Sequence, residues 1–252
     1  QGLPDIDKTF IDFKSDGFHT TYAEAAELAP EIRDIKDPDL AALGFVDFQG
    51  TYTGFIRDFV ANGTLNTGLG SVRADLNMKL PSGKTPAYSG TLSTEGFNLG
   101  KFLRNDQLGS IAFTGSAKGT GFNLRQSSAE LNGTVRSFEF NNYTYQNVTV
   151  TGTLNQREFN GSAIVDDPNL KARLDGYINL NNEQEPEYNV MLDVQRGNLK
   201  EVNLTKEDMN VLGKFRLNFK GRTIDDFIGE ASLYDVAFTQ SGQVYVFDTL
   251  HL

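Results

Sequence analysis

Few side chains in this sequence of 252 residues are of the types that carry out chemistry. Cysteine is absent, which excludes a thiol nucleophile, a disulfide framework and a cysteine-zinc site. The only histidines are His19 and His251, and two such residues do not supply a multi-histidine metal site or favour a histidine-based triad. We therefore expect a protein that is not an enzyme and that has no metal and no cofactor.

Two acidic pairs and one glycine-rich stretch have simple interpretations. Asp5 with Asp7, and Asp37 with Asp39, match the spacing of two calcium ligands but lack the glycine and glutamate of an EF-hand. Residues 67–71 contain no lysine and no helix follows them, so a phosphate cradle is not expected. We interpret the acids as solvated loop residues and the glycine-rich stretch as a turn.

The strongest pattern in the sequence is a glycine between two apolar residues, in the frame apolar-x-Gly-x-apolar. It occurs about three times more often than composition alone gives. In a strand, positions i, i+2 and i+4 share a face, so each glycine lies on the apolar face and marks a bend, a bulge or a close approach. Some copies are Asn-Gly pairs, for which a tight hairpin turn is the alternative. The glycines of ten such frames are Gly50, Gly63, Gly90, Gly115, Gly133, Gly152, Gly161, Gly176, Gly221 and Gly229.

Apolar and polar residues alternate strictly over long segments, for example over 72–80 and 170–180. This period of two with a solvated polar face is typical of antiparallel sheets, since parallel sheets are covered on both faces. The pattern predicts an all-β fold, a long antiparallel curled sheet with an apolar interior. The expected strands are 10–14, 45–56, 58–66, 71–80, 87–93, 110–117, 129–140, 143–154, 157–165, 170–180, 187–195, 213–221, 226–234 and 244–248.

Three short helices are expected between the strands. Thr21 and Glu24 form a capping-box pattern that opens a helix to about Leu28. Asp37 followed by Pro38 predicts a second helix to Leu43, and 205–212 a third. We expect them to cap the sheet or to plug it near 21–43.

No linker or composition shift divides the chain, so we expect a single β-groove segment over 1–252. A start at Gln1 and no apolar run of membrane-spanning length suggest an internal fragment of a longer chain. The net charge of −10, from 33 acidic and 23 basic residues, argues against nucleic acid as a partner.

The apolar face has three possible uses. It fills a closed sandwich or barrel, it lines a groove for acyl chains, or it faces lipid from an outer-membrane barrel, for which aromatic girdles are missing. The expected groove-lining residues are Phe48, Gly50, Tyr52, Leu65, Leu76, Tyr88, Gly90, Leu92, Phe113, Leu131, Gly133, Val135, Val148, Val150, Gly152, Leu154, Phe159, Leu174, Gly176, Ile178, Val190, Leu192, Leu217 and Phe219.

Several motifs resemble a known family over nearly the whole chain. They include the runs 50–59, 62–65 and 67–70, then 140–148 with 151–154, and finally 159–161, 166–170 and 198–199. The chain thereby resembles the TamB branch of the AsmA-like proteins, as found in Bacteroidota.

The resemblance implies a periplasm-spanning β-taco in a Gram-negative bacterium, anchored in the inner membrane, that carries phospholipid acyl chains between the two membranes. It also implies a partner among outer-membrane barrels of the BamA superfamily. The anchor and the partner-binding domain of the family are not evident here, so partner contacts are not assigned to residues. Two other functions stay open: a scaffold or chaperone for assembly of outer-membrane barrels, whose sheet edge templates strands, and a surface adhesin.

Overall fold

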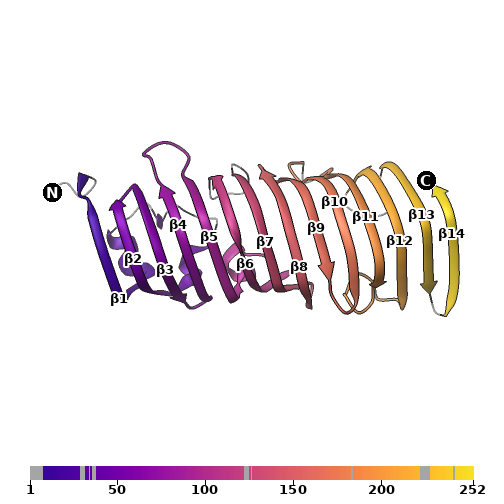
Figure 1. The fold of residues 1–252 in the computed structure, drawn as a ribbon, viewed down its shortest axis with the longest axis horizontal. Helices are drawn as coiled ribbons and strands as arrows, with labels where there is room; N and C mark the ends of the chain where they lie inside the picture. Colours follow the sequence, from indigo (N-terminus) through magenta and orange to yellow (C-terminus); the bar gives the residue numbers. More distant parts are fainter. Residues whose placement is uncertain are drawn as a thin grey trace. The chain divides into compact units, whose positions relative to one another are not determined.

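The structure is a computed structural model that describes residues 8–28, 32–33, 35, 38–121, 125, 127–182, 184–221, 228–240 and 242–252. The chain divides into two compact units, Gln1–Gly133 and Thr134–Leu252, which are described one at a time below. The strands are ordered in the sheet as they are in the chain, from β1 to β14, and the sheet does not close into a barrel (Figure 1). The predicted all-β antiparallel fold with a few short helices is confirmed.

The first unit contains six strands and the beginning of a seventh. Its first six strands pair antiparallel in chain order. The strands are β1 (Ile11–Thr21), β2 (Phe45–Phe55), β3 (Asp58–Thr67), β4 (Gly70–Lys79), β5 (Ala87–Asn98), β6 (Leu108–Thr120) and β7 (Ser128–Phe140), the last of which crosses into the second unit.

The second unit continues with seven strands that also pair antiparallel in chain order. They are β8 (Tyr143–Asn155), β9 (Glu158–Asp166), β10 (Leu170–Asn179), β11 (Glu187–Asn198), β12 (Met209–Lys220), β13 (Ile228–Gln240) and β14 (Gln243–His251). All fourteen strands therefore lie where alternation predicts them, and several extend beyond the predicted range.

β1 shows why a strand can be longer than the alternating segment of sequence that predicts it. The register of β1 on β2 shifts between Ser15 and Phe18, so a bulge interrupts the alternation. A bulge moves the following side chains to the opposite face, and a strict period-two pattern stops there. The predicted strand ended at residue 14, whereas pairing continues to Thr21.

The first predicted helix is confirmed as α1, Tyr22–Leu28. The Thr21 amide donates to Glu24 Oε2 at 2.8 Å, and the Glu24 amide donates to Thr21 Oγ1 at 3.2 Å. These two hydrogen bonds are the reciprocal pair of a capping box. The Thr21 amide, and the Thr21 hydroxyl at 3.0 Å, both donate to the Glu24 carboxylate, and these two bonds lower the pKa of the Glu24 carboxyl.

The second predicted helix is a single 3₁₀ turn, η3, over Leu40–Leu43. Its N-cap is Asp39, whose carboxylate accepts from the Ala42 amide at 3.3 Å. The predicted cap, Asp37, lies outside the described residues.

The third predicted helix, over 205–212, is wrong, and a different helix was missed. Thr205 lies in a turn region and β12 begins at Met209, because the apolar residues from Val211 onward alternate at the strand period. The missed helix is α2, Leu99–Leu103, capped by the Asn98 side chain, which accepts from the Lys101 amide at 2.9 Å. Five residues are too few to show a helical hydrophobic period.

The two units repeat the same backbone connections at positions 100 apart. Leu80 donates to the Arg57 carbonyl, and Leu180 donates to the Arg157 carbonyl. Three more features follow the same interval. These are the amide hydrogen bonds Asn98 to Leu69 and Asn198 to Asn169, the amide hydrogen bonds Gly121 to Pro86 and Gly221 to Pro186, and the bulges at Thr94 to Phe97 and Val194 to Gly197. A structural period of 100 residues, containing six strands, therefore runs from β3 to β14.

Candidate apolar binding face

In unit 1, cross-strand pairing brings the predicted apolar residues together on one face, here called the inner face. Residues that pair across antiparallel strands point to the same side of the sheet. Four rows cross β2 to β6. They are Phe48, Leu65, Val72, Thr94, Phe113; Gly50, Gly63, Ala74, Leu92, Gly115; Tyr52, Ala61, Leu76, Gly90, Ala117; and Gly54, Phe59, Met78, Tyr88, Gly119.

Unit 2 has an inner face of the same construction across β8 to β12. Its four rows are Val148, Val165, Ala172, Val194, Gly213; Val150, Ala163, Leu174, Leu192, Phe215; Gly152, Gly161, Gly176, Val190, Leu217; and Leu154, Phe159, Ile178, Tyr188, Phe219. The alternation of the sequence therefore assigned side chains to faces correctly in both units.

At the glycines of these rows, the place that a side chain would take is filled by the backbone of the neighbouring strand and is not open space. A Cβ on Gly63 would lie 2.3 Å from the Gln49 carbonyl oxygen and 2.9 Å from Gly50 Cα. In unit 2, a Cβ on Gly161 would lie 2.3 Å from the Thr151 oxygen and 2.6 Å from Gly152 Cα. Of the interpretations that the sequence pattern offers, close approach therefore holds at these positions, because the missing side chains let the backbones of adjacent strands come together.

Aromatic rings cover several of these glycines. The Phe113 ring comes within 2.5 Å of the Cβ position of Gly115 and 2.4 Å of that of Gly133. The Phe159 ring covers Gly152 and Gly161 in the same way, at 2.8 and 2.9 Å. A ring lying over a cross-strand glycine replaces the missing side chain and fixes the register. The Asn-Gly pairs at Gly63, Gly133 and Gly161 lie inside strands, so the alternative of hairpin turns is wrong.

The inner face is half-buried over nearly its whole area. All of the 24 predicted lining residues are half-buried except Val135 and Val190, which are 9% and 5% exposed. The side chains between them along each strand are mostly exposed, as the predicted polar face requires. A closed hydrophobic core would bury such residues almost completely. The inner face of each unit is therefore apolar and partly accessible to a ligand.

One rim of the inner face of unit 1 is covered by its short helices. The Gly68 amide donates to the Leu43 carbonyl at 2.9 Å, and the Asp39 amide donates to the Phe102 carbonyl at 2.8 Å. Arg104 Nε donates to Asp39 Oδ2 at 2.9 Å, which is the main reason that the pKa of the Asp39 carboxyl is lowered. η3 and α2 are thereby joined to the β3–β4 turn. We call this edge the clip rim.

The same rim of unit 2 is covered by residues 199–205, the connection between β11 and β12. Val202 is completely buried, and its carbonyl accepts from the Tyr145 hydroxyl at 3.1 Å. Asn203 Nδ2 donates to the Asn141 carbonyl at 2.9 Å. This connection occupies the position of α2 in the 100-residue period, since Asn198 caps it as Asn98 caps α2.

A buried carboxylate joins β8 to the β9–β10 turn at the clip rim of unit 2. Asp167, in the β9–β10 turn, is 1% exposed and accepts from the Tyr143 hydroxyl at 2.5 Å. It also accepts from the amides of Gln146 and Asn169 at 2.9 and 2.8 Å. Burial, and then the hydrogen bond to Asp167, raise the pKa of the Tyr143 phenol. Sequence pattern assigned Asp167 only to a turn.

Two tyrosines of the inner face of unit 1 have perturbed acidity. Burial raises the pKa of the Tyr52 and Tyr88 phenols above the ordinary value. Near the pKa of an ordinary tyrosine, these phenols therefore stay protonated in the folded chain, whereas the same phenols ionise in the unfolded chain. Their contribution to stability is complete below that pH and is lost as the pH rises through their pKa in the folded chain. We expect Tyr88→Phe to remove a late-ionising phenol from an alkaline titration followed by phenolate absorbance. Loss of an early-ionising phenol would contradict this placement.

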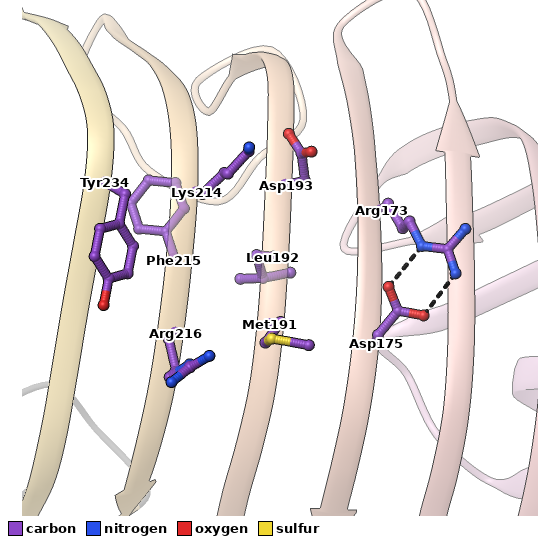
Figure 2. A pocket seen from close by; sticks show the side chains of 9 residues that line it. All are labelled: Arg173, Asp175, Met191, Leu192, Asp193, Lys214, Phe215, Arg216 and Tyr234. Atoms are coloured by element: carbon purple, nitrogen blue, oxygen red, sulfur yellow. Dashed lines mark hydrogen bonds and ion pairs between the residues drawn. The ribbon is translucent and has the colours of Figure 1, made fainter.

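A separate depression of about 310 Å3 lies on the polar face of unit 2. Arg173 donates to both carboxylate oxygens of Asp175, at 2.6 and 2.9 Å (Figure 2). The other lining residues are Met191, Leu192, Asp193, Lys214, Phe215, Arg216 and Tyr234. Its basic and acidic side chains alternate over neighbouring strands, which suits a solvated surface. Sequence reasoning did not single out this depression.

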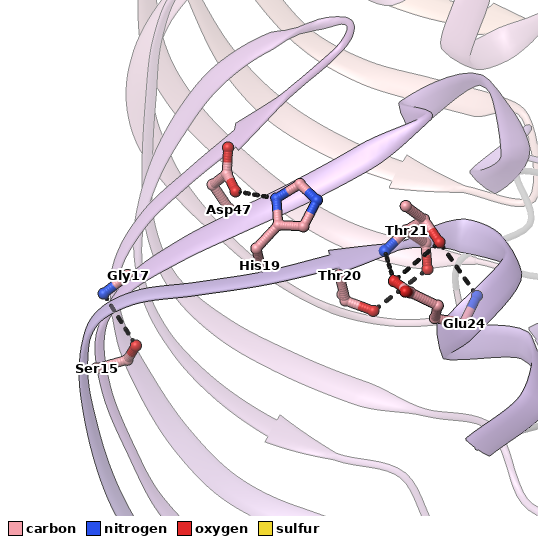
Figure 3. A network of polar contacts seen from close by, with 7 residues as sticks. All are labelled: Ser15, Gly17, His19, Thr20, Thr21, Glu24 and Asp47. Carbon is pink, nitrogen blue, oxygen red and sulfur yellow. Dashed lines mark hydrogen bonds and ion pairs between the residues drawn. The ribbon is translucent and has the colours of Figure 1, made fainter.

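The histidine near α1 belongs to a surface ion pair. His19 Nδ1 contacts Asp47 Oδ1, and the ring stacks on Phe45, with 6.1 Å between centroids. Figure 3 shows this pair beside the capping box of Thr21 and Glu24. The His19 side chain is 61% exposed. The described residues contain no group of three or more acidic, histidine or cysteine side chains arranged to hold a metal ion.

Helices in the described part of the chain are all too short or too polar to cross a membrane. Comparisons of the chain with protein-family models, with curated proteins and with solved structures gave no match.

Proposed function

We propose that the inner face of each unit holds the acyl chains of phospholipids, as one segment of a conduit between the inner and outer membranes of a Gram-negative bacterium. The observation that carries this proposal is the half-burial of an apolar face built from four rows of paired residues in each unit. The resemblance to the TamB branch supports the same function, a periplasmic location and a BamA-superfamily barrel as partner.

The physics of such a face suits transport better than tight binding at one place. Each methylene removed from water contributes about 0.8 kcal/mol, so an acyl chain is held along its length. Rows of Val, Leu and Phe offer similar surroundings at successive positions, so a chain slides without leaving the apolar surface. The polar outer faces keep the protein itself in water.

The test is the phospholipid content of the chain purified from a Gram-negative host, measured by lipid extraction and mass spectrometry. Leu174→Asp places a charge in the middle of the inner face of unit 2. We expect it to lower bound phospholipid at least about fivefold, because an unpaired charge is costly against apolar surface.

The matched control is Ile164→Asp, which makes the same kind of change on the polar face. Ile164 is 42% exposed and is followed in β9 by the inner-face residue Val165. Both variants are checked for folding by circular dichroism. Equal phospholipid in folded Leu174→Asp and in the control, or no phospholipid in the unmodified chain, would rule out the conduit. If Leu174→Asp unfolds, the inner face is an ordinary packed core.

A second candidate function, a scaffold that templates strands of outer-membrane barrels, is favoured by β14. Val244 and Val246 are 63% and 67% exposed, and Tyr245, on the other face, is 46% exposed. A strand with exposed apolar residues on both faces is suited to pairing with an added strand. Binding of an added barrel-strand peptide to β14, without bound phospholipid, is the result that would favour the scaffold over the conduit.

A further inference from the structure

The two rims of the inner face differ, and the difference is the same in both units. At the clip rim, η3 and α2 cover unit 1 and the connection 199–205 covers unit 2. The opposite rim, here called the hairpin rim, consists of the strand ends near 55–58 and 79–87 in unit 1, and near 155–158 and 179–187 in unit 2. Among the described residues, α2 contacts β6 and packs Phe102 against Phe97 of β5, and α1 contacts β1.

The described residues of the hairpin rim are exposed or half-buried, except Pro186, which is buried. The connection over 81–85 is exposed throughout. Lys79 and Asp58 form a surface ion pair at 3.7 Å in unit 1, and Lys220 and Glu187 form one at 2.6 Å in unit 2. Such exposed pairs stay hydrated and contribute little to stability.

The row of inner-face residues nearest the hairpin rim carries one phenylalanine and one tyrosine at equivalent positions in the two units. Phe59 and Tyr88 occupy it in unit 1, and Phe159 and Tyr188 occupy the positions 100 residues later. Tyr188 stacks on Phe219, with 4.8 Å between ring centroids. The row nearest the clip rim consists of Val148, Val165, Ala172, Val194 and Gly213 in unit 2; in unit 1 it contains Phe48 and Phe113 but no tyrosine.

Tyrosine is suited to the boundary between an apolar surface and water. Its ring packs against hydrocarbon, and its hydroxyl hydrogen-bonds to polar groups at the edge. Tyr88 and Tyr188 are half-buried, at equivalent positions of the period. By contrast, Tyr145 at the clip rim uses its hydroxyl to hold the covering connection in place, through the Val202 carbonyl.

We infer that phospholipids lie across the inner face with one fixed orientation, their headgroups at the hairpin rim beside Tyr88 and Tyr188 and their acyl ends toward the clip rim. This inference rests on the proposed function. The clip covers the apolar end, where acyl chains need shelter from water. The hairpin rim leaves the headgroup in water, where its phosphate and amine stay hydrated.

The experiment compares two phosphatidylethanolamine probes bound to the whole chain, one with a photoreactive diazirine on the headgroup and one with it at the end of an acyl chain. After illumination, labelled residues are mapped by peptide mass spectrometry. We expect the headgroup probe to label the peptides containing Tyr88 and Tyr188 several-fold more than peptides at the clip rim. The acyl probe is expected to give the reverse preference.

Variants sharpen the assignment. The double change Tyr88→Leu and Tyr188→Leu is expected to reduce the preference of the headgroup probe for this rim. Tyr177→Leu, on the polar face of β10, is expected to leave that preference intact. Headgroup labelling at the clip rim, or equal labelling of both rims, overturns the orientation while lipid binding stands. Absence of labelling by both probes overturns the orientation and the conduit together.

Discussion

Gly63→Ala is expected to lower the free energy of unfolding by about 3 kcal/mol, a large effect for the addition of one methyl group. The backbone of Gly63 is of a kind that alanine adopts without strain, so the cost is steric alone. The added Cβ would meet the Gln49 carbonyl oxygen at 2.3 Å, and that oxygen belongs to a paired strand that moves only by disturbing its hydrogen bonds. Urea denaturation followed by circular dichroism measures the change.

Gly96→Ala is the matched control. Gly96 lies in the same unit and in a strand, its backbone is equally tolerant, and a Cβ there would meet nothing within 4 Å. It is expected to be neutral or slightly stabilising, by about 0.5 kcal/mol, since alanine restricts the unfolded chain. Similar effects of the two changes would show that the close approach of β2 and β3 is not what requires glycine.

Asp167→Ala is expected to destabilise the chain by about 3 kcal/mol, because it leaves two partly buried backbone hydrogen-bond donors and one hydroxyl without their acceptor. The donors are Gln146, Asn169 and Tyr143, at the clip rim of unit 2. Thermal or urea unfolding gives the size of the loss. Hydrogen exchange of the Gln146 and Asn169 amides is expected to quicken.

The neighbouring residue provides the control for this prediction. The Asp166 side chain is 63% exposed, and its partner is Lys171 Nζ at 3.3 Å. Asp166→Ala should change the free energy of unfolding by no more than about 0.5 kcal/mol. If the two alanine variants were equally stable, Asp167 would be an ordinary turn residue rather than the centre of a network.

The strands and their inner faces could be predicted because alternation is a local property. Val72 to Met78 and Leu170 to Ile178 report their face through their immediate neighbours. The bulge after Ser15 defeated the same reasoning, since one extra residue exchanges the faces. The false helix at 205–212 arose because Thr205 and Asp208 resemble cap residues, while the alternation that begins at Met209 determines the structure.

The covering of the clip rim and the 100-residue period could not be predicted from local sequence patterns. The contacts that place residues 199–205 join positions about sixty apart, such as Tyr145 with Val202, and have no signature in either segment. The period is hidden because few residue types are preserved, and the preserved ones are scattered. They include Arg57 and Arg157, Phe59 and Phe159, Pro86 and Pro186, Tyr88 and Tyr188, Leu92 and Leu192, Asn98 and Asn198, and Gly121 and Gly221. What the structure retains is the hydrogen bonding of turns and caps.

The period also sets how such a chain can change its reach during evolution. Each period of 100 residues adds six strands, or about 29 Å of sheet width at the usual strand spacing. Each brings its own cap asparagine, its own covering connection and its own rim tyrosine. Duplication or deletion of one period would therefore change the width of the sheet in steps of six strands, with each step keeping its own cap and cover.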